Sequence, residues 1–271
     1  MVDKTRQDIA NVICIKWGNA YGAEDVNRLH AMVRRNIHHH DLRFFCFTDD
    51  SEGFHPDIHV RALPIVHLED PRDLKHIYRK EVGLCDDDLG DLHDERVLFF
   101  DLDVIITGEL DSMIAYPKDD EFVIINDWNT IGDHVGQATC YSWRVGTLGH
   151  IKADFESRPK EVIRHYHTSS QGYLSAMVRK TIGPLKFWPD EWCRSFKFHA
   201  LPVWYKRPFV APELPEKTKV LAFHGHPKIE DAILGRWSPK KPPFYKRVYK
   251  TILPSPWIKQ YWYNDTTSDK S

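Results

Sequence analysis

The sequence predicts an α/β fold built on a mostly parallel sheet flanked by helices, and two observations support it. Short apolar strands alternate with an amphipathic helix near the N-terminus, and a strand–helix–strand order at this spacing is typical of a right-handed βαβ unit. An apolar run over residues 96–107, rich in Val, Ile and Phe, is interrupted by two carboxylates, as expected of a buried strand and its end. Because the 271 residues contain no internal repeat, we expect a single domain.

The first elements follow from hydrophobic spacing. Residues 11–15 are an apolar strand that leads into a glycine-bearing loop. Apolar side chains then recur at intervals of three and four over 24–37, which predicts a helix. Residues 43–48 form the second strand, which a turn-forming run ends, and 58–63 form a shorter third strand.

The remaining elements surround the run over 96–107. We predict helices over 78–84, 155–166 and 172–180, and strands over 97–100, 122–125, 196–201 and 220–223. The region after residue 184 is rich in Pro and aromatic residues.

Composition excludes several classes of protein. A formal net charge of −2 gives no overall nucleic-acid signature, and we expect no nucleic-acid partner. No apolar run of about 18 residues spans a membrane, and no apolar core follows the polar start (1–6) as in a signal peptide. The five scattered cysteines form no C-x-x-C, which argues against a zinc site or a disulfide framework. These features favour a cytoplasmic protein with reduced thiols.

The pair Asp101 and Asp103 carries the most chemical information. Buried carboxylates cost free energy unless a cation or hydrogen bonds compensate them. The two carboxylates are two positions apart, and we expect both to reach one ion where the strand ends and the backbone turns. Strand ends are also where open α/β sheets bind ligands. The pair therefore predicts a divalent metal over a diphosphate, with a chance surface turn as the alternative.

Four features in this order resemble glycosyltransferases of the GT-A fold, close to the glycogenin-like family 8. They are the first-strand loop (16–22), the helical pair Arg79–Lys80, the D-x-D, and the late segment Phe-His-Gly-His-Pro-Lys (223–228). In that family the D-x-D binds Mn²⁺ or Mg²⁺, which holds the diphosphate of a UDP-sugar. The resemblance covers roughly residues 11–230. It implies a GT-A domain over 9–232 and an extension over 233–271.

The resemblance also implies a set of site residues. The metal ligands are Asp101, Asp103 and His224, with His226 as the competing imidazole. The donor-binding residues are Lys16, Trp17, Tyr21, Lys80, Asp101, Asn126 and Lys228. Gln171 and Asp127 are the candidate catalytic residues. Ser170 stands where the family has an aspartate, so the sugar and the acceptor are left open.

The implied function is a metal-dependent, retaining hexosyltransferase that moves a sugar from a UDP-sugar to a carbohydrate or glycolipid acceptor. A lipid-linked sugar or a lipopolysaccharide would be such an acceptor. Two alternatives stay open. One is a haloacid-dehalogenase-type phosphohydrolase, whose D-x-D normally follows the first strand. The other is a non-catalytic module that binds a nucleotide sugar.

The C-terminal tail is basic and aromatic. Residues 232–264 contain no Asp or Glu, and Lys and Arg alternate there with Trp, Tyr and Phe. The basic residues are Arg236, Lys240, Lys241, Lys246, Arg247, Lys250 and Lys259. Cations are attracted to anionic headgroups, and Trp and Tyr favour the membrane interface, so the tail predicts peripheral binding to the inner face of a membrane. The alternative is that these aromatic residues pack on the domain.

Overall fold

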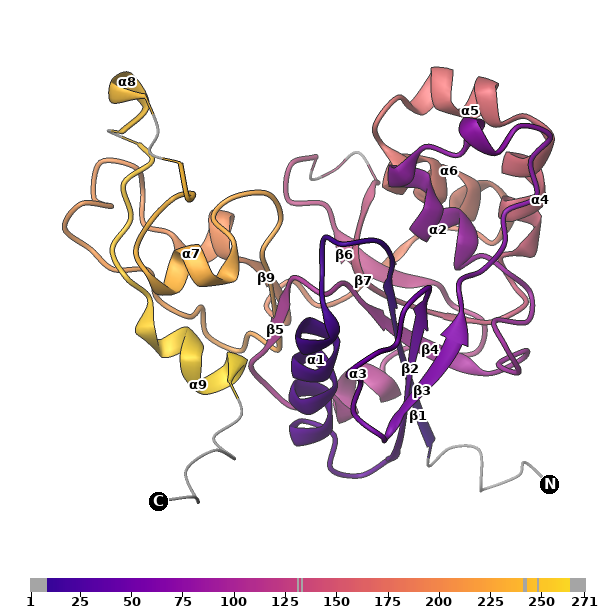
Figure 1. Cartoon of the computed structure of the whole chain (residues 1–271), viewed down its shortest axis with the longest axis horizontal. Coiled ribbons are helices and arrows are strands. Elements are labelled where there is room, and N and C mark those ends of the chain that lie inside the picture. The colour runs from indigo at the N-terminus through magenta and orange to yellow at the C-terminus, as the bar shows by residue number, and fades with distance from the viewer. Residues whose placement is uncertain (1–8, 131, 133, 241–242, 248, 264–271) are drawn as a thin grey trace. The chain divides into compact units, whose positions relative to one another are not determined.

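The structure, a computed structural model, describes residues 9–130, 132, 134–240, 243–247 and 249–263 (Figure 1). The chain forms two compact units. The sheet unit comprises residues 1–26, 39–102 and 111–188, and the C-terminal unit comprises 27–38, 103–110 and 189–271. Among the described residues, no helix is both long enough and apolar enough to cross a membrane. All five cysteines are buried free thiols.

The sheet unit contains a seven-stranded sheet in the order β3-β2-β1-β4-β7-β6-β8. Its strands are β1 (Ile9–Lys16), β2 (Asp41–Thr48), β3 (Ile58–Ala62), β4 (Arg96–Phe100), β6 (Val123–Asn126), β7 (Gly136–Arg144) and β8 (Lys186–Phe187). The pairs β3–β2, β2–β1, β1–β4 and β6–β8 are parallel, and β7 is antiparallel to both of its neighbours. The predicted mostly parallel sheet is confirmed.

Helices pack on this sheet. The sheet unit contains α2 (Arg79–Gly83), α3 (Asp111–Ala115), α4 (Gly149–Ser157), α5 (Pro159–Tyr166), α6 (Ser170–Thr181) and the 3₁₀ turns η2 (Pro71–Asp73) and η3 (His76–Tyr78). Helices α2, α4, α5 and α6 gather into one layer (Figure 1). Helix α1 (Ala23–Arg35) begins in the sheet unit and continues into the C-terminal unit.

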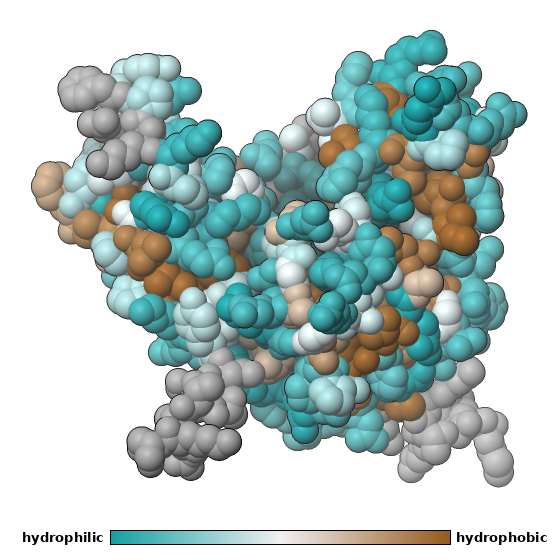
Figure 2. All heavy atoms as spheres, viewed as in Figure 1, coloured by the Kyte–Doolittle hydropathy of each residue, from teal (hydrophilic) through white to brown (hydrophobic). Residues whose placement is uncertain are grey.

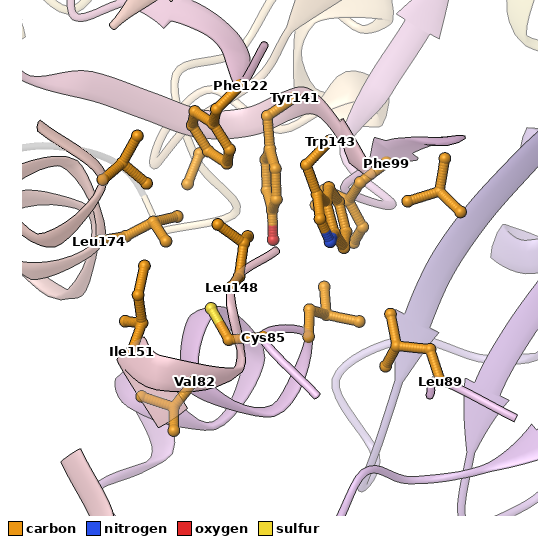
Figure 3. Packing of buried hydrophobic residues seen from close by; sticks show 14 of the residues in the cluster. Val82, Cys85, Leu89, Phe99, Phe122, Tyr141, Trp143, Leu148, Ile151 and Leu174 are labelled. Carbon is orange, nitrogen blue, oxygen red and sulfur yellow. The ribbon is translucent and has the colours of Figure 1, made fainter. Parts of the chain in front are cut away.

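An aromatic row forms the centre of the sheet unit's core. The rings of Phe99 and Tyr141 lie 4.9 Å apart, and Tyr141 stacks on Trp143 at 4.9 Å. Figure 3 shows this row pointing from the sheet toward Val82 of α2 and Ile151 of α4. Because strand side chains alternate, the side chain two positions beyond Phe99 points to the same helical layer. That side chain is a carboxylate.

The C-terminal unit has a small sheet of its own. Strands β5 (Val104–Ile106), β10 (Val220–Ala222) and β9 (Cys193–Ser195) lie in the order β5-β10-β9, with β10 antiparallel to β5 and parallel to β9. Its other elements are the π-helical turn η4 (Phe196–Ala200), α7 (Ile229–Ile233), α8 (Phe244–Arg247), the 3₁₀ turn η5 (Pro256–Ile258) and α9 (Lys259–Trp262).

Three predicted elements differ from the structure. The helix over 155–166 is two helices, α4 and α5, because the residue before Pro159 is driven out of the helical region, with Arg158 at φ −149°. The strand over 196–201 is the turn η4, which the Ser195 hydroxyl caps by accepting the Phe198 N–H at 3.3 Å. The apolar run over 96–107 is two strands, β4 and β5, in different sheets.

Candidate active site

Asp101 directly follows the central strand β4. Its N–H donates to the Thr139 carbonyl of β7 at 2.9 Å, which continues the strand pairing by one residue. Both of its carboxylate oxygens accept hydrogen bonds from Lys80 Nζ, each at 2.9 Å. Lys80 comes from α2, the helix that covers this face of the sheet. The structure thus brings together two predicted site residues that are 21 positions apart.

Lys80 is saturated with acceptors. Besides Asp101, its ammonium donates to the Ala138 carbonyl at 3.0 Å and lies 3.3 Å from Glu81 Oε1. Burial lowers the pKa of Lys80, but the carboxylates of Asp101 and Glu81 outweigh burial, so the pKa is raised above its ordinary value. Lys80 therefore stays charged. The contacts show a residue that positions Asp101, and its predicted contact with a donor stays a prediction.

Gln171 reaches the same point of the sheet from α6. Its Oε1 accepts the Ala138 N–H at 3.4 Å, while the Ala138 carbonyl accepts a hydrogen bond from Lys80. The register between β6 and β7 shifts between Ile124 and Ile125, opposite this part of β7. Such irregularities are common beside active sites because they redirect backbone groups. Asp101, Lys80 and Gln171 therefore converge on residues 138–139.

The loop after β1 is held by neighbouring loops. Lys16 is buried and donates to the Asp50 carbonyl at 3.1 Å. The Trp17 ring lies 5.0 Å from that of His76, four positions before Lys80, and its buried Nε1 has no hydrogen-bond partner among the described residues. Tyr21 is half-buried in the same loop. Because this nitrogen is buried and Trp17 packs against the hydrophobic core, its predicted contact with a donor stays a prediction.

Asn126 and Asp127 end β6, as predicted. Asp127 is buried, and its carboxylate accepts from the Thr130 hydroxyl at 2.7 Å and from the backbone and side-chain nitrogens of Asn129 at 3.4 and 3.3 Å. The carboxylate therefore shapes its own loop. Whether it also acts on a substrate stays a prediction.

Asp103 and His224 meet within the C-terminal unit. The Phe223 N–H donates to the Asp103 carbonyl at 2.9 Å, which extends the β5–β10 pairing, and His224 is the next residue. His224 Nε2 lies 2.8 Å from the Ser195 hydroxyl, and its ring stacks at 5.6 Å on that of Phe198. These contacts fix the imidazole of a residue whose chain neighbour pairs, through its backbone, with the second aspartate of the D-x-D.

The other two polar side chains of the segment 223–228 contact different carboxylates. Lys228, at the start of α7, places its Nζ 3.1 Å from the Asp103 carboxylate. His226 instead lies 3.8 Å from Asp231, which also binds Arg236. Gly225 has φ +75°, a value that favours glycine, so the chain can turn directly after the first histidine. These positions favour His224 over His226 as a partner of Asp103.

The donor atoms of Asp101, Asp103 and His224 fit a divalent ion. Carboxylate oxygens suit Mg²⁺ and Mn²⁺, and an imidazole nitrogen is acceptable to Mn²⁺. In this structure each carboxylate is paired with a lysine, Lys80 on Asp101 and Lys228 on Asp103, with which a bound cation would share it. The residues present therefore fit the metal that the sequence predicted.

The tail packs in part on the C-terminal unit. Ile252, Ile258 and Trp262 are buried, and Trp257 Nε1 donates to the Pro212 carbonyl at 2.9 Å. This part matches the alternative in which the aromatic residues pack on the domain. Lys241 and residues 264–271 lie outside the described residues, as do residues 1–8 and the side chains of Phe244 and Arg247.

Several groups at these sites escaped the sequence prediction. They are Glu81 and the backbone groups of Ala138 and Thr139 in the sheet unit, and Ser195 and Phe198 in the C-terminal unit. Only Glu81 left a signal, as a carboxylate next to a predicted site lysine. The others act through backbone atoms or through strand neighbours that are distant in sequence.

Three solved structures that share this fold are glycosyltransferases. The galactosyltransferase LgtC, solved in complex with donor and acceptor sugar analogs, matches with a TM-score of 0.54 and 12% identity over 81% of this chain and 88% of LgtC. A glutamine-to-glutamate active-site mutant of LgtC matches with a TM-score of 0.53, 12% identity and coverage of 81% and 89%. The bifunctional glycosyltransferase WbbM matches with a TM-score of 0.53 and 14% identity over 96% of this chain and 52% of WbbM. No family model and no curated protein matches the sequence. The chain has the GT-A fold that its sequence predicted.

Proposed function

We propose that this protein is a metal-dependent glycosyltransferase that moves a hexosyl group from a UDP-sugar to a carbohydrate or glycolipid acceptor. The convergence of Asp101, Lys80 and Gln171 at the end of the central strand carries this proposal. The GT-A fold supports it, because the neighbours LgtC and WbbM are glycosyltransferases. By contrast, the D-x-D follows the fourth strand of the chain, whereas in the phosphohydrolase alternative it normally follows the first.

We assign Asp101, Asp103 and His224 as ligands of Mn²⁺ or Mg²⁺. A bound ion would supply positive charge to the leaving diphosphate, which is often the largest electrostatic contribution to such a reaction. Lys80 holds Asp101 in place, and Ser195 and Phe198 hold the imidazole. Lys228 is exposed over 41% of its side chain, so it can move from Asp103 to a phosphate.

The loop after β1 and the end of β6 are assigned to the nucleoside and the sugar. Trp17 offers a half-buried aromatic ring, Lys16 ties the loop to the Asp50 carbonyl, and Tyr21 lies half-buried in the same loop. Asn126 is half-buried at its strand end and can present its amide to a sugar hydroxyl. These assignments remain proposals to be tested residue by residue.

We assign Gln171 to the anomeric carbon, where its amide would orient the donor as the oxocarbenium-like state forms. The neighbour with a mutated active-site glutamine is consistent with this role. Asp127 is retained as a second candidate catalytic residue. The reaction is proposed to proceed with retention, by attack of the acceptor on the face that the diphosphate leaves.

We further propose a cytoplasmic enzyme that binds the inner face of a membrane through its tail. The exposed Lys240 and Lys259 belong to a stretch without acidic residues, which suits anionic lipid. Co-sedimentation with phosphatidylglycerol vesicles tests this. The double variant Lys240→Gln, Lys259→Gln should bind fewer vesicles, and unchanged binding would exclude these lysines from the contact.

UDP release from a panel of UDP-sugars, with and without Mn²⁺, tests the main proposal. We expect release that EDTA abolishes and that Asp103→Asn reduces at least about 100-fold. Asp119→Asn, which neutralises an exposed carboxylate, is the matched control and should leave the rate unchanged. Turnover that persists in EDTA would refute the metal. Hydrolysis of p-nitrophenyl phosphate without UDP release would favour the phosphohydrolase, and UDP-sugar binding without release would favour a binding module.

A further inference from the structure

The C-terminal unit contains a hollow that the D-x-D does not use. Trp204, Arg207, Tyr245 and Tyr249 line a cavity of about 590 Å³. Small-molecule sites typically enclose roughly 300–1,000 Å³, so this volume is in the range of a small ligand. Every lining residue has an aromatic ring or a guanidinium group. This composition can bind flat or ring-shaped ligands that carry negative charge.

Arg207 is fixed but lacks a counter-charge. Its Nε donates to the Pro202 carbonyl at 3.0 Å and its Nη1 to the Tyr249 carbonyl at 2.6 Å. Burial lowers its pKa, which reports the cost of removing the charge from water. Among the described residues no carboxylate pairs with Arg207, and residues 232–264 contain no Asp or Glu at all. A partly desolvated cation without a carboxylate is stabilised by an anionic ligand.

A second cation lies beside it. The Arg207 guanidinium and the Lys250 ammonium lie 5.7 and 5.6 Å from the ring of Trp237. No carboxylate pairs with Lys250 in the part of the chain that the structure describes. The sheet unit offers a contrast, because its hollow of about 420 Å³ contains Lys152, which is already paired with Asp86. Of these two hollows, the C-terminal one has cations that no carboxylate pairs with among the described residues, so a ligand can neutralise their charge.

The aromatic lining is open to solvent. Trp204 is 52% exposed and Tyr245 70% exposed, although exposed aromatic side chains are costly in water. Separately from this lining, Figure 2 shows hydrophobic side chains at the surface of the C-terminal unit among hydrophilic ones. Aromatic faces stack on the C–H faces of sugar rings, and a guanidinium binds a phosphate through two parallel hydrogen bonds.

We propose that this hollow is a binding site for a phosphate-bearing saccharide. The inference rests on the proposed transferase function, in which such a saccharide would be the anionic part of the acceptor. Trp204 and Tyr245 stack on the sugar, and Arg207 with Lys250 holds the phosphate. Trp204 follows Phe198, whose ring stacks on His224, by six residues, so the hollow and the second half of the D-x-D belong to the same unit.

Titration calorimetry on the full chain, without UDP-sugar or metal, tests the site. The probes are lactose 1-phosphate, lactose and inorganic phosphate. We expect lactose 1-phosphate to bind about tenfold more tightly than either of the other two. Trp204→Ala and Tyr245→Ala should weaken its binding about tenfold and several-fold. Phe209→Ala, which removes an 82% exposed ring outside the lining, is the control and should bind as the wild type does.

Arg207→Lys separates charge from geometry. It keeps the positive charge but loses the planar fork, so it should weaken lactose 1-phosphate and leave lactose unchanged. Equal affinity in wild type and Trp204→Ala, or no binding of lactose 1-phosphate at millimolar concentration, would overturn the proposal. Loss of vesicle binding alone in these variants would assign the hollow to lipid instead. Because Asp103→Asn should bind the probe normally, failure of this site and failure of the transferase function are distinguishable.

Discussion

The two units each hold one carboxylate of the D-x-D with a lysine, but the two pairs differ in burial. In the sheet unit the Lys80 and Asp101 side chains are 14% and 25% exposed, and Glu81 adds a second carboxylate. In the C-terminal unit the Lys228 side chain is 41% exposed, and Asp103 is the one carboxylate it pairs with among the described residues. One ion pair is therefore part of the folded core, and the other lies where solvent and ligands can reach its lysine.

This difference indicates different tasks for the two lysines. Breaking a buried pair leaves a carboxylate without compensation, whereas an exposed pair contributes little because water screens it. Lys80 is thus expected to act through stability and through the position of Asp101. Lys228 is expected to act through a ligand.

Lys80→Met should have the largest effect on stability. The variant leaves the carboxylates of Asp101 and Glu81 without their shared cation, so the free energy of unfolding should fall by about 3–5 kcal/mol. Urea denaturation followed by tryptophan fluorescence measures this. Lys160→Met, which removes an exposed lysine of the same unit, is the control and should change stability by less than about 1 kcal/mol. A loss for Lys80→Met as small as that of the control would show that the pair is not part of the core.

Lys228→Met should instead alter function. Because its lysine is exposed, stability should change by less than about 1 kcal/mol, while KM for the UDP-sugar should rise about tenfold through loss of one charge-assisted hydrogen bond. Steady-state UDP release, measured beside urea denaturation, separates the two effects. An unchanged KM with lowered stability would reverse the roles given to the two lysines.

A smaller effect should appear with pH. Burial, and then the Arg194 guanidinium, lower the pKa of His199 in the C-terminal unit. Below an unfolded-state pKa of about 6.5 the unfolded chain therefore binds more protons than the folded one, so stability falls as the pH falls. The raised pKa of Lys80 acts in the opposite range, since its contribution is complete below about pH 10.4 and is lost only above it.

His199→Asn is the variant that checks the pH effect. Its amide oxygen can replace Nδ1 as the acceptor of the Ser195 N–H, which the wild type binds at 3.0 Å. The free energy of unfolding should then decrease less between pH 7 and pH 5 than it does in the wild type. Parallel pH profiles for the two proteins would rule out His199 as the source.

The two units also differ in how well the sequence predicted them. The apolar strands of the sheet unit were recognised because continuous apolar runs end at turn residues. Strand β7 was missed, since polar Thr139 and Ser142 lie among its apolar residues, and both are buried in the structure. Ser142 is accommodated there by a hydrogen bond from Arg96 at 3.3 Å, a partner 46 positions away. Local patterns contain no trace of such partners.

The C-terminal unit was harder to predict from the sequence because its strands have only three residues each. Asp101 and Asp103 were recognised from the cost of carboxylates in an apolar run, which is a local property. The sequence did not predict that the backbone passes from one sheet to another between these two aspartates, because β5 pairs with β10, which lies more than a hundred residues later. The domain boundary proposed at residue 232 and the individual roles of the site residues remain predictions.

Mn²⁺ binding in the presence of UDP, followed by electron paramagnetic resonance, tests the central claim most directly. We expect the wild type to bind one Mn²⁺ with UDP, and Asp101→Asn, Asp103→Asn and His224→Gln each to weaken this binding at least about tenfold. Asp119→Asn should bind as the wild type does. Unchanged Mn²⁺ binding in the three variants would contradict the assignment of Asp101, Asp103 and His224 as metal ligands.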